Sequence, residues 1–302
     1  MIDYAAARAV AAIVRTGSFE KAALSLHVTP SAVSQRVKQL EERLGAVLIE
    51  RGTPCTATEK GALLCRHMER LGILEKELME HLPGLADLSS PSRHVTLNVA
   101  TNADSLGTWF LEAIASFTGK TDYLMNIAID DQDHTADWLR RGKVLAAVTS
   151  NADPVQGCRV TPLGALRYHA TASPQFLQRH FPTGVTAEAC ETAPALTFNQ
   201  KDRLQHIWTR RIFGREISFP THWLPSTQSF LEASLAGMGW ALNPAELARD
   251  HLASGRLVEL VPGKPLDVPL FWQINRLAAK HLHELTRAVV RVARDKLVQP
   301  GA

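Results

Sequence analysis

Small polar residues and basic residues are combined in one short stretch near the N-terminus. Ser31 and Ser34 are small enough to let a helix approach DNA closely, and Gln35 carries an amide that can bond the edge of a base. Arg36 and Lys38 follow them and supply positive charge for phosphates. This arrangement is typical of the recognition helix of a helix-turn-helix.

The other candidate DNA contacts flank that stretch. Ser18 opens the preceding helix, Pro30 starts the recognition helix, and Arg51 and Thr53 lie in a short hairpin that can grip the DNA backbone as a wing. The alternative is an ordinary three-helix bundle with serines on its surface. That alternative explains the apolar residues equally well. It does not explain a polar, uncharged face followed by a charged helix end and a basic hairpin, so we favour DNA binding.

A second group of chemically capable residues lies at 102–105. Asn102, Asp104 and Ser105 follow an apolar run typical of a strand and precede a helix. Free N–H groups at a helix start, with the Ser105 hydroxyl, suit a carboxylate, and Asp104 can pair with an ammonium group. This combination fits the main chain of a free amino acid. The alternative is plain helix capping, which the same residue types favour, and both can hold together.

A basic ligand side chain needs a carboxylate of its own. Asp130, Asp131, Asp133 and Asp202 are available, and we place Asp131 and Asp202 in the effector site. The acidic run 130–133 is equally well explained as a solvated loop, as charge runs usually are. The remaining candidates are polar residues near expected strand ends and helix starts, with one aromatic residue that fits the core as well: Thr149, Asn199, Gln228, Ser229 and Trp109.

Three helices are needed to position the DNA-contacting residues, and residues 4–45 carry their pattern. The first helix ends at Gly17, and Ser18 can cap the second. Thr29 caps the third, which has proline at its first helical position, and Gly45 ends it.

The chain beyond these helices predicts a hairpin, a long helix and a linker. Residues 47–58 read as two short extended pieces around Gly52 and Pro54. Residues 59–82 place leucines along one face of a helix that is too apolar there to stand alone, so we expect it to pair with a copy of itself. Residues 85–93 contain Ser and Pro and mark the domain boundary.

Strands and helices alternate after the linker. Strands are expected at 95–101, 123–130 and 144–150 and near 168, 194 and 270, and helices at 104–118, 133–141, 229–238 and 279–297. The alternation predicts an α/β fold with a parallel-type sheet. Ligands then bind beyond the carboxyl ends of the strands.

The arrangement AA-x₂-L-x-V-T-P-S-A-V-S-x₂-V-x₂-LE-x₂-LG at 22–45 resembles the LysR-type transcriptional regulators. Within that family, three stretches resemble the branch of ArgP and LysG, which regulates the export of basic amino acids. They are NADSLGTWF at 102–110, DQDHTADWLRRG at 131–142 and LGALRYHATASPQFLQRHFPTGVT at 163–186. The similarity covers essentially the whole chain.

The resemblance implies a fold, an effector and a set of partners. The implied units are a winged helix-turn-helix at 1–58, a dimerising linker helix at 59–82, and an effector domain at 93–302 with two α/β subdomains, 93–163 plus 269–302 and 164–268, like those of a periplasmic binding protein. The implied effector is lysine or arginine, and the implied target is an exporter gene. The expected partners are double-stranded operator DNA, the amino acid and RNA polymerase, in a homodimer or homotetramer without membrane contact.

Residues for several other functions are missing from the sequence. There is no CxxC pair, histidine cluster, HExxH, GxSxG, P-loop or GxGxxG, so we predict no metal, no cofactor, no catalytic residues and no enzyme. The net charge of +3 permits nucleic-acid binding without arguing for it. The absence of a signal-peptide pattern and of a long apolar stretch predicts a cytoplasmic protein with reduced thiols.

Three alternative functions are weighed against a regulator that responds to a basic amino acid. The first is a LysR-type regulator with a different small-molecule effector. The second is an origin-binding inhibitor of replication initiation that has no effector, a label that members of this branch also carry. The third, a solute-binding protein, is disfavoured because no export signal is present.

Overall fold

The computed structural model describes residues 2–82, 95–130, 135–279 and 281–300. It divides into two compact units. Unit 1 comprises residues 1–98 with the short pieces 122–126 and 140–145, and unit 2 comprises the rest of the chain. Among the described residues, no helix is both long and apolar enough to cross a membrane.

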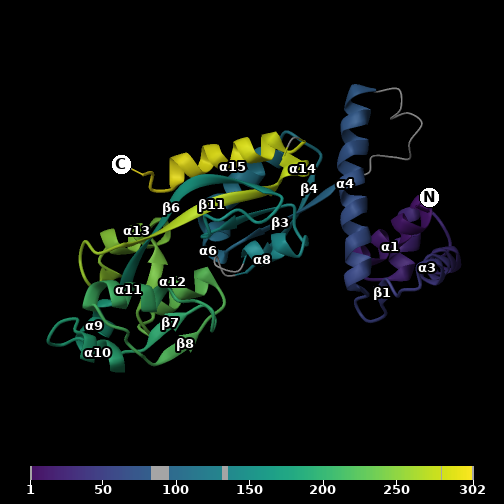
Figure 1. Ribbon diagram of the computed structural model, residues 1–302. Helices are drawn as coiled ribbons and strands as arrows, with labels where there is room; N and C mark the ends of the chain where they lie inside the picture. The colour runs from purple at the N-terminus through teal and green to yellow at the C-terminus, as the bar shows by residue number, and fades with distance from the viewer. Residues whose placement is uncertain (1, 83–94, 131–134, 280, 301–302) are drawn as a thin grey trace. The chain divides into compact units, whose positions relative to one another are not determined.

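Unit 1 contains the three predicted helices, a hairpin and a long helix. Their bounds are α1 (Tyr4–Thr16), α2 (Phe19–Leu26), α3 (Pro30–Leu44), β1 (Ile49–Glu50), β2 (Thr56–Ala57) and α4 (Glu59–His81) (Figure 1). The predicted helix signals are confirmed. Ser18 and Thr29 cap α2 and α3 with their hydroxyl oxygens, and Gly17 and Gly45 end α1 and α3 with left-handed φ angles of 73° and 59°.

The hairpin is fixed to the helices by close backbone approaches. The Cys55 N–H donates to the Gly17 carbonyl at 2.8 Å. The Glu41 carboxylate of α3 accepts hydrogen bonds from the Leu48 and Ile49 N–H groups at 2.7 and 3.3 Å. At the start of α4, Gly61 lies directly against the Leu48 carbonyl, where a Cβ atom would collide. These contacts orient the predicted wing.

Unit 2 is built on strands of a large mixed sheet. The strand order is β10-β6-β11-β5-β3-β4, and β9 also pairs with β6. The bounds are β3 (Thr96–Thr101), β4 (Leu124–Ile129), β5 (Ala146–Thr149), β6 (Cys158–Ala172), β9 (Ala241–Pro244), β10 (Val258–Glu259) and β11 (Leu266–Asn275).

The expectation of a parallel-type sheet is only partly confirmed. β3 and β5 are parallel, with Val99 opposite Ala146, but β11 runs antiparallel to both β5 and β6. The long strand β6 carries the chain away from the β3–β5 part of the sheet, and β11 brings it back. Two neighbouring strands that leave and return in this way must run in opposite directions.

Helices cover this sheet and form a second layer. The first group is α6 (Ala103–Ser105), the π-helical turn η1 (Leu106–Phe110), α7 (Leu111–Thr118), α8 (Thr135–Arg140), α14 (Arg276–Ala279) and α15 (His283–Lys296), and α15 packs against α7 and β6. The second group surrounds the parallel pair β7 (Ala195–Thr197) and β8 (Thr221–Trp223) and comprises α9 (Pro174–His180), α10 (Ala187–Thr192), α11 (Leu204–Phe213), α12 (Thr227–Leu235) and α13 (Ala245–Ala253) (Figure 1). The sequence pattern did not predict α9, α10, α11 or α13.

Candidate DNA interface and effector site

The two faces of α3 differ sharply. Val33, Val37 and Leu40 are buried against α1 and α2, whereas Ser31 and Gln35 are exposed on the opposite face. The first turn is held by its cap, because the Thr29 hydroxyl accepts a hydrogen bond from the Ala32 N–H at 3.2 Å. The helix therefore presents its polar N-terminal half to solvent, as entry into a DNA groove requires.

The remaining predicted DNA contacts are also accessible. Pro30, Lys38, Arg51 and Thr53 are exposed, and Ser18, Ser34 and Arg36 are partly exposed. The Arg51 guanidinium lies 5.3 Å from the centre of the Phe19 ring, so a cation–π contact holds it beside the start of α2. Lys38 forms only an exposed ion pair with Glu42 at 3.8 Å, which leaves its ammonium group available to a phosphate.

The turn between β3 and α6 uses Asn102 as its cap. The Asn102 side-chain oxygen accepts a hydrogen bond from the Ser105 N–H at 3.0 Å. Asn102, and not Asp104, therefore caps this helix. The Asp104 carboxylate instead accepts hydrogen bonds from the Tyr168 hydroxyl at 2.8 Å and from the Thr227 hydroxyl at 2.6 Å.

Buried hydroxyl groups without partners surround this turn. In the described part of the chain, neither the Thr101 nor the Ser105 side-chain hydroxyl makes a hydrogen bond, although both residues are fully buried. An unsatisfied buried hydroxyl costs roughly 1–3 kcal/mol. The helix after Ser105 continues as a π-helical turn, a distortion often found at functional sites. These features are those of a place that binds a polar ligand.

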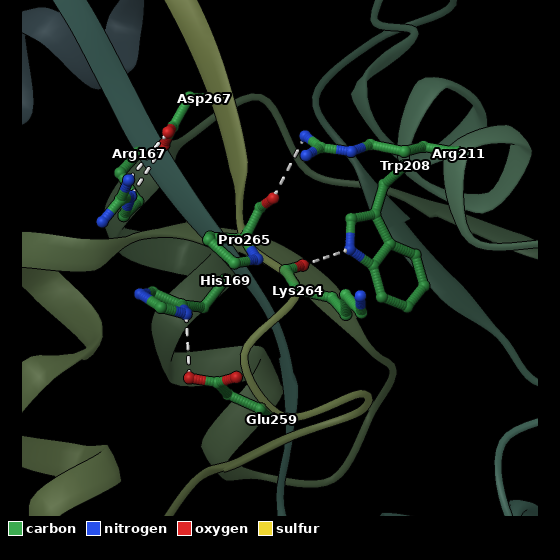
Figure 2. Close-up of polar contacts among 8 residues, drawn as sticks. All are labelled: Arg167, His169, Trp208, Arg211, Glu259, Lys264, Pro265 and Asp267. Atoms are coloured by element: carbon green, nitrogen blue, oxygen red, sulfur yellow. Dashed lines mark hydrogen bonds and ion pairs between the residues drawn. The ribbon is translucent and has the colours of Figure 1, made fainter. Parts of the chain in front are cut away.

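Strand β6 brings Tyr168 to Asp104 and holds it by contacts on its other face. Figure 2 shows Arg167 and His169, the neighbours of Tyr168 in the strand, with their partners. Because side chains alternate between the faces of a strand, Tyr168 lies on the opposite face from these two residues. Arg167 forms two hydrogen bonds with Asp267 at 2.7 and 2.8 Å, and the His169 ring lies 2.9 Å from Glu259. Figure 2 also shows α11 tied to the same region, through the Trp208 indole and the Arg211 guanidinium, which donate to backbone carbonyls of residues 264 and 265.

A second carboxylate, that of Asp202, lies near Asp104. Its oxygens accept hydrogen bonds from the Phe198 and Leu204 N–H groups at 3.1 and 3.0 Å, which join the two ends of the loop after β7. Burial raises the pKa of Asp202, and the charge of Asp104 raises that pKa further. The Asn199 side chain stabilises the same loop by accepting from the N–H groups of Lys201 and Asp202. Two carboxylates close enough for the charge of one to raise the pKa of the other provide a favourable site for a cation.

Comparisons with known proteins give this architecture a family. Residues 5–62 match the bacterial regulatory helix-turn-helix protein model of the lysR family, and residues 91–298 match the LysR substrate binding domain. The chain belongs to the LysR family. Its fold is therefore an N-terminal helix-turn-helix followed by an α/β domain of the substrate-binding type, and it is a DNA-binding transcriptional regulator that responds to a small molecule.

Relatives named LysG and ArgP are similar to this chain over most of its length. The transcriptional regulator LysG of Mycobacterium tuberculosis is 45% identical over 281 residues, which cover 93% of this chain and 90% of LysG. The regulator ArgP of Pseudomonas fluorescens is 40% identical over 99% of both chains. Full-length LysG from Corynebacterium glutamicum, solved with bound effector Arg, is 36% identical over 99% of this chain and all of that one, with a TM-score of 0.68. These relatives are regulators, and this LysR-family chain is likewise not an enzyme.

The other residues predicted for the effector site of this LysR-family chain have varied positions. Thr149 is buried at the end of β5, beside β3. Trp109 is fully buried next to Phe110, in the core. Gln228 and Ser229 are exposed, and the Gln228 amide donates to Glu232. Asp131, with Asp133, lies outside the described residues.

Two further residues contact Asp104, and one of them, Tyr168, was not predicted from the sequence. Tyr168 and Thr227 both donate to Asp104, and the backbone of Gly107 passes close to Thr227. Thr227 is the first residue of α12, directly before Gln228 and Ser229, and lies two residues ahead of the predicted helix start at 229. Tyr168 carries no local signal, because its partner lies 64 residues away in the sequence. A separate cavity of about 400 Å³ lies between α7 and α15 and is lined by none of these residues.

Proposed function

We propose that this LysR-family regulator acts in the cytoplasm and responds to a basic amino acid, lysine or arginine. We propose that it controls a gene for an amino-acid exporter. The observation that carries the proposal is the pair of carboxylates, Asp104 and Asp202, at a helix start with unpartnered buried hydroxyls. The Arg-bound structure of the LysG relative supports the same class of effector.

The main chain of the amino acid is proposed to bind at the turn between β3 and α6. A carboxylate has about four acceptor positions on its two oxygens, and Tyr168 and Thr227 use one on each oxygen of Asp104. The ligand's ammonium group is proposed to join these two hydroxyl donors at the Asp104 carboxylate. The ligand's carboxylate can accept from the free hydroxyls of Thr101 and Ser105.

The side-chain cation of the ligand is proposed to face the carboxylates at the strand ends. Asp202 is buried in the loop after β7 and is close enough to Asp104 for their charges to interact. Asp130 follows β4, and its N–H donates to the Thr101 carbonyl at 3.2 Å, which places it beside the same turn. A basic amino acid brings a cation to these carboxylates and a neutral one does not, so the site favours a basic one.

Calorimetric titration of the full chain tests this proposal. L-lysine or L-arginine is expected to bind saturably, and norleucine and glutamate to bind at least about tenfold more weakly, a difference of about 1.4 kcal/mol. Equal binding of norleucine would favour a different class of effector. Footprinting of the exporter promoter with and without the bound amino acid tests regulation. A footprint that ignores the amino acid would favour the origin-binding alternative.

DNA recognition is proposed to use the exposed face of α3 and the hairpin. Ser31, Ser34 and Gln35 are placed to contact base edges, and Arg36, Lys38, Arg51 and Thr53 the phosphates, with Ser18 and Pro30 at the helix starts. RNA polymerase is proposed as a further partner.

Assembly is proposed to use α4. Leu63, Leu74 and Leu78 are about half exposed along one side of this helix. A groove of about 350 Å³ at its base is lined mainly by apolar side chains, including Leu44 and Leu63. A second copy of the chain would cover this surface and give a homodimer, or a homotetramer through a further contact.

A further inference from the structure

The loop after β7 carries a cation that lies at the effector site itself. The Lys201 ammonium is 3.7 Å from a carboxylate oxygen of Asp130. These two residues belong to different elements, one after β7 and the other after β4. A protein that binds a cationic ligand thus already places a lysine side chain at one of its candidate ligand carboxylates.

Asp130 is oriented for such a role. Its N–H donates to the Thr101 carbonyl, and one of its carboxylate oxygens accepts a hydrogen bond from the Trp138 indole at 3.1 Å. The other oxygen faces Lys201. The Trp138 hydrogen bond fixes the orientation of the carboxylate, and the oxygen near Lys201 is the one at which we expect the ligand cation to bind.

A hydrogen bond fixes the Lys201 backbone, whereas the Lys201 side chain is partly exposed to solvent. The Lys201 N–H donates to the Asn199 side chain at 2.7 Å, in the same loop that buries Asp202. About half of its side chain is exposed, against a quarter for Asp130. An exposed ammonium can leave its partner for water at small cost, because such ion pairs contribute little.

We propose that Lys201 competes with the effector for Asp130, so that the side-chain cation of a bound basic amino acid displaces the Lys201 ammonium. This inference rests on the proposed function and adds a determinant of affinity and specificity to it. Without ligand, Lys201 neutralises Asp130. A ligand with a side-chain cation replaces one ion pair by another, whereas a neutral amino acid leaves the resident pair in place.

Titration of four forms of the full chain tests the competition: wild type, Lys201→Met, Asp130→Asn and the double variant. Lys201→Met is expected to bind lysine and arginine about two- to fivefold more tightly, because an exposed pair of this kind has a small energy. Asp130→Asn is expected to bind them more weakly, and Lys201→Met is expected to add nothing in that background. Lys201→Arg keeps the charge and should keep wild-type affinity. Lys120→Met, at an exposed lysine near the end of α7, is the control for removal of a positive charge.

The outcomes separate the two proposals. Weaker binding by Lys201→Met would show that Lys201 supports ligand binding, and unchanged binding would show that it takes no part; either result overturns the competition. A gain that persists with Asp130→Asn, or that appears equally with norleucine or in Lys120→Met, also overturns it, since the effect would then be general electrostatics. If wild type binds neither lysine nor arginine, the proposed function fails and the competition fails with it.

Discussion

Asp104 is held by hydroxyl groups from two distant parts of the chain. The Tyr168 hydroxyl donates to one oxygen of the Asp104 carboxylate and the Thr227 hydroxyl to the other. Nearby Asp202 has a raised pKa because it is buried and faces the Asp104 charge. The two carboxyl groups therefore lie close together, where the proposed cationic ligand is expected to bind.

Replacing Asp104 by Asn is expected to weaken lysine and arginine binding about tenfold or more. A charge-assisted hydrogen bond contributes about 1.5–3 kcal/mol, and the neutral amide provides only one acceptor oxygen. Calorimetry on the full chain measures the loss. Asp153→Asn, at an exposed aspartate, is the matched control. Unchanged affinity in Asp104→Asn would move the ammonium site to Asp130 or Asp202.

Gln35 is the residue on α3 whose loss should change base preference. Gln35→Ala is expected to cost roughly 1–3 kcal/mol of specific DNA binding and to relax preference at one operator position. Gln39→Ala, one turn farther from the helix N-terminus, is the control and should have a smaller effect. Binding to a set of operator variants at fixed salt measures both. The recognition helix would be wrongly assigned if Gln35→Ala changed neither affinity nor preference.

Helix α4 begins where the hairpin leaves no room for a side chain. A Cβ atom added at Gly61 would collide with the Leu48 carbonyl. A Cβ atom added at Gly72, three turns later, would meet only side-chain atoms, none closer than 3.7 Å. The same helix therefore contains one glycine that close packing requires and one that it does not. Helix propensity alone would favour alanine at both positions.

The two glycines predict opposite results for the same substitution. Gly61→Ala is expected to lower the free energy of unfolding by about 1–3 kcal/mol, because a backbone carbonyl must move. Gly72→Ala is expected to be neutral or to stabilise by up to about 1 kcal/mol, because alanine restricts the unfolded chain. Urea unfolding measures both variants. Equal effects would show that α4 starts with looser packing than the structure has.

An ion pair between Arg167 and Asp267 joins strands β6 and β11, and its contribution to stability depends on pH. The Arg167 hydrogen bonds lower the pKa of Asp267 below its ordinary value of 3.8. A depressed pKa means that the stabilisation is present above about pH 4 and is lost as the pH falls through the folded-state pKa. The pair is partly exposed, so its contribution is small.

Asp267→Asn is expected to lower Tm by at most about 4 °C at pH 7, and the difference from wild type should shrink as the pH falls below 4. Thermal unfolding of both chains between pH 7 and pH 3 measures this. Asp153→Asn controls for the loss of one charge. A difference that stays constant over this range would mean that Asp267 stabilises the strands by packing and not by charge.

At the scale of the whole molecule, the exposed leucines of α4 are proposed to form the dimer contact. Leu74→Glu combined with Leu78→Glu is expected to yield a monomer and to abolish specific operator binding, since charge at a buried interface is strongly unfavourable. Leu277→Glu makes the same change at an exposed leucine of α14 and should leave the assembly intact. Sedimentation at micromolar concentration measures the mass. A wild-type monomer that still binds its operator tightly would contradict the proposed dimer.

The helices around the DNA-contacting residues could be predicted from the sequence because their signals are local. A cap such as Thr29 acts on an N–H three residues away, and a terminating glycine such as Gly45 acts on the turn just before it. The first strand–helix turn was predicted for the same reason. Asn102 caps it, as a polar residue after a strand favours.

The effector site and the direction of the long strands were decided only by tertiary structure. Asp104 meets Tyr168 across 64 residues of sequence and Thr227 across 123. No periodicity connects positions so far apart, and the same is true of the antiparallel pairing of β6 with β11. Such contacts depend on how the whole chain closes upon itself. Local energies select the elements, but only the folded chain determines which of their polar side chains meet.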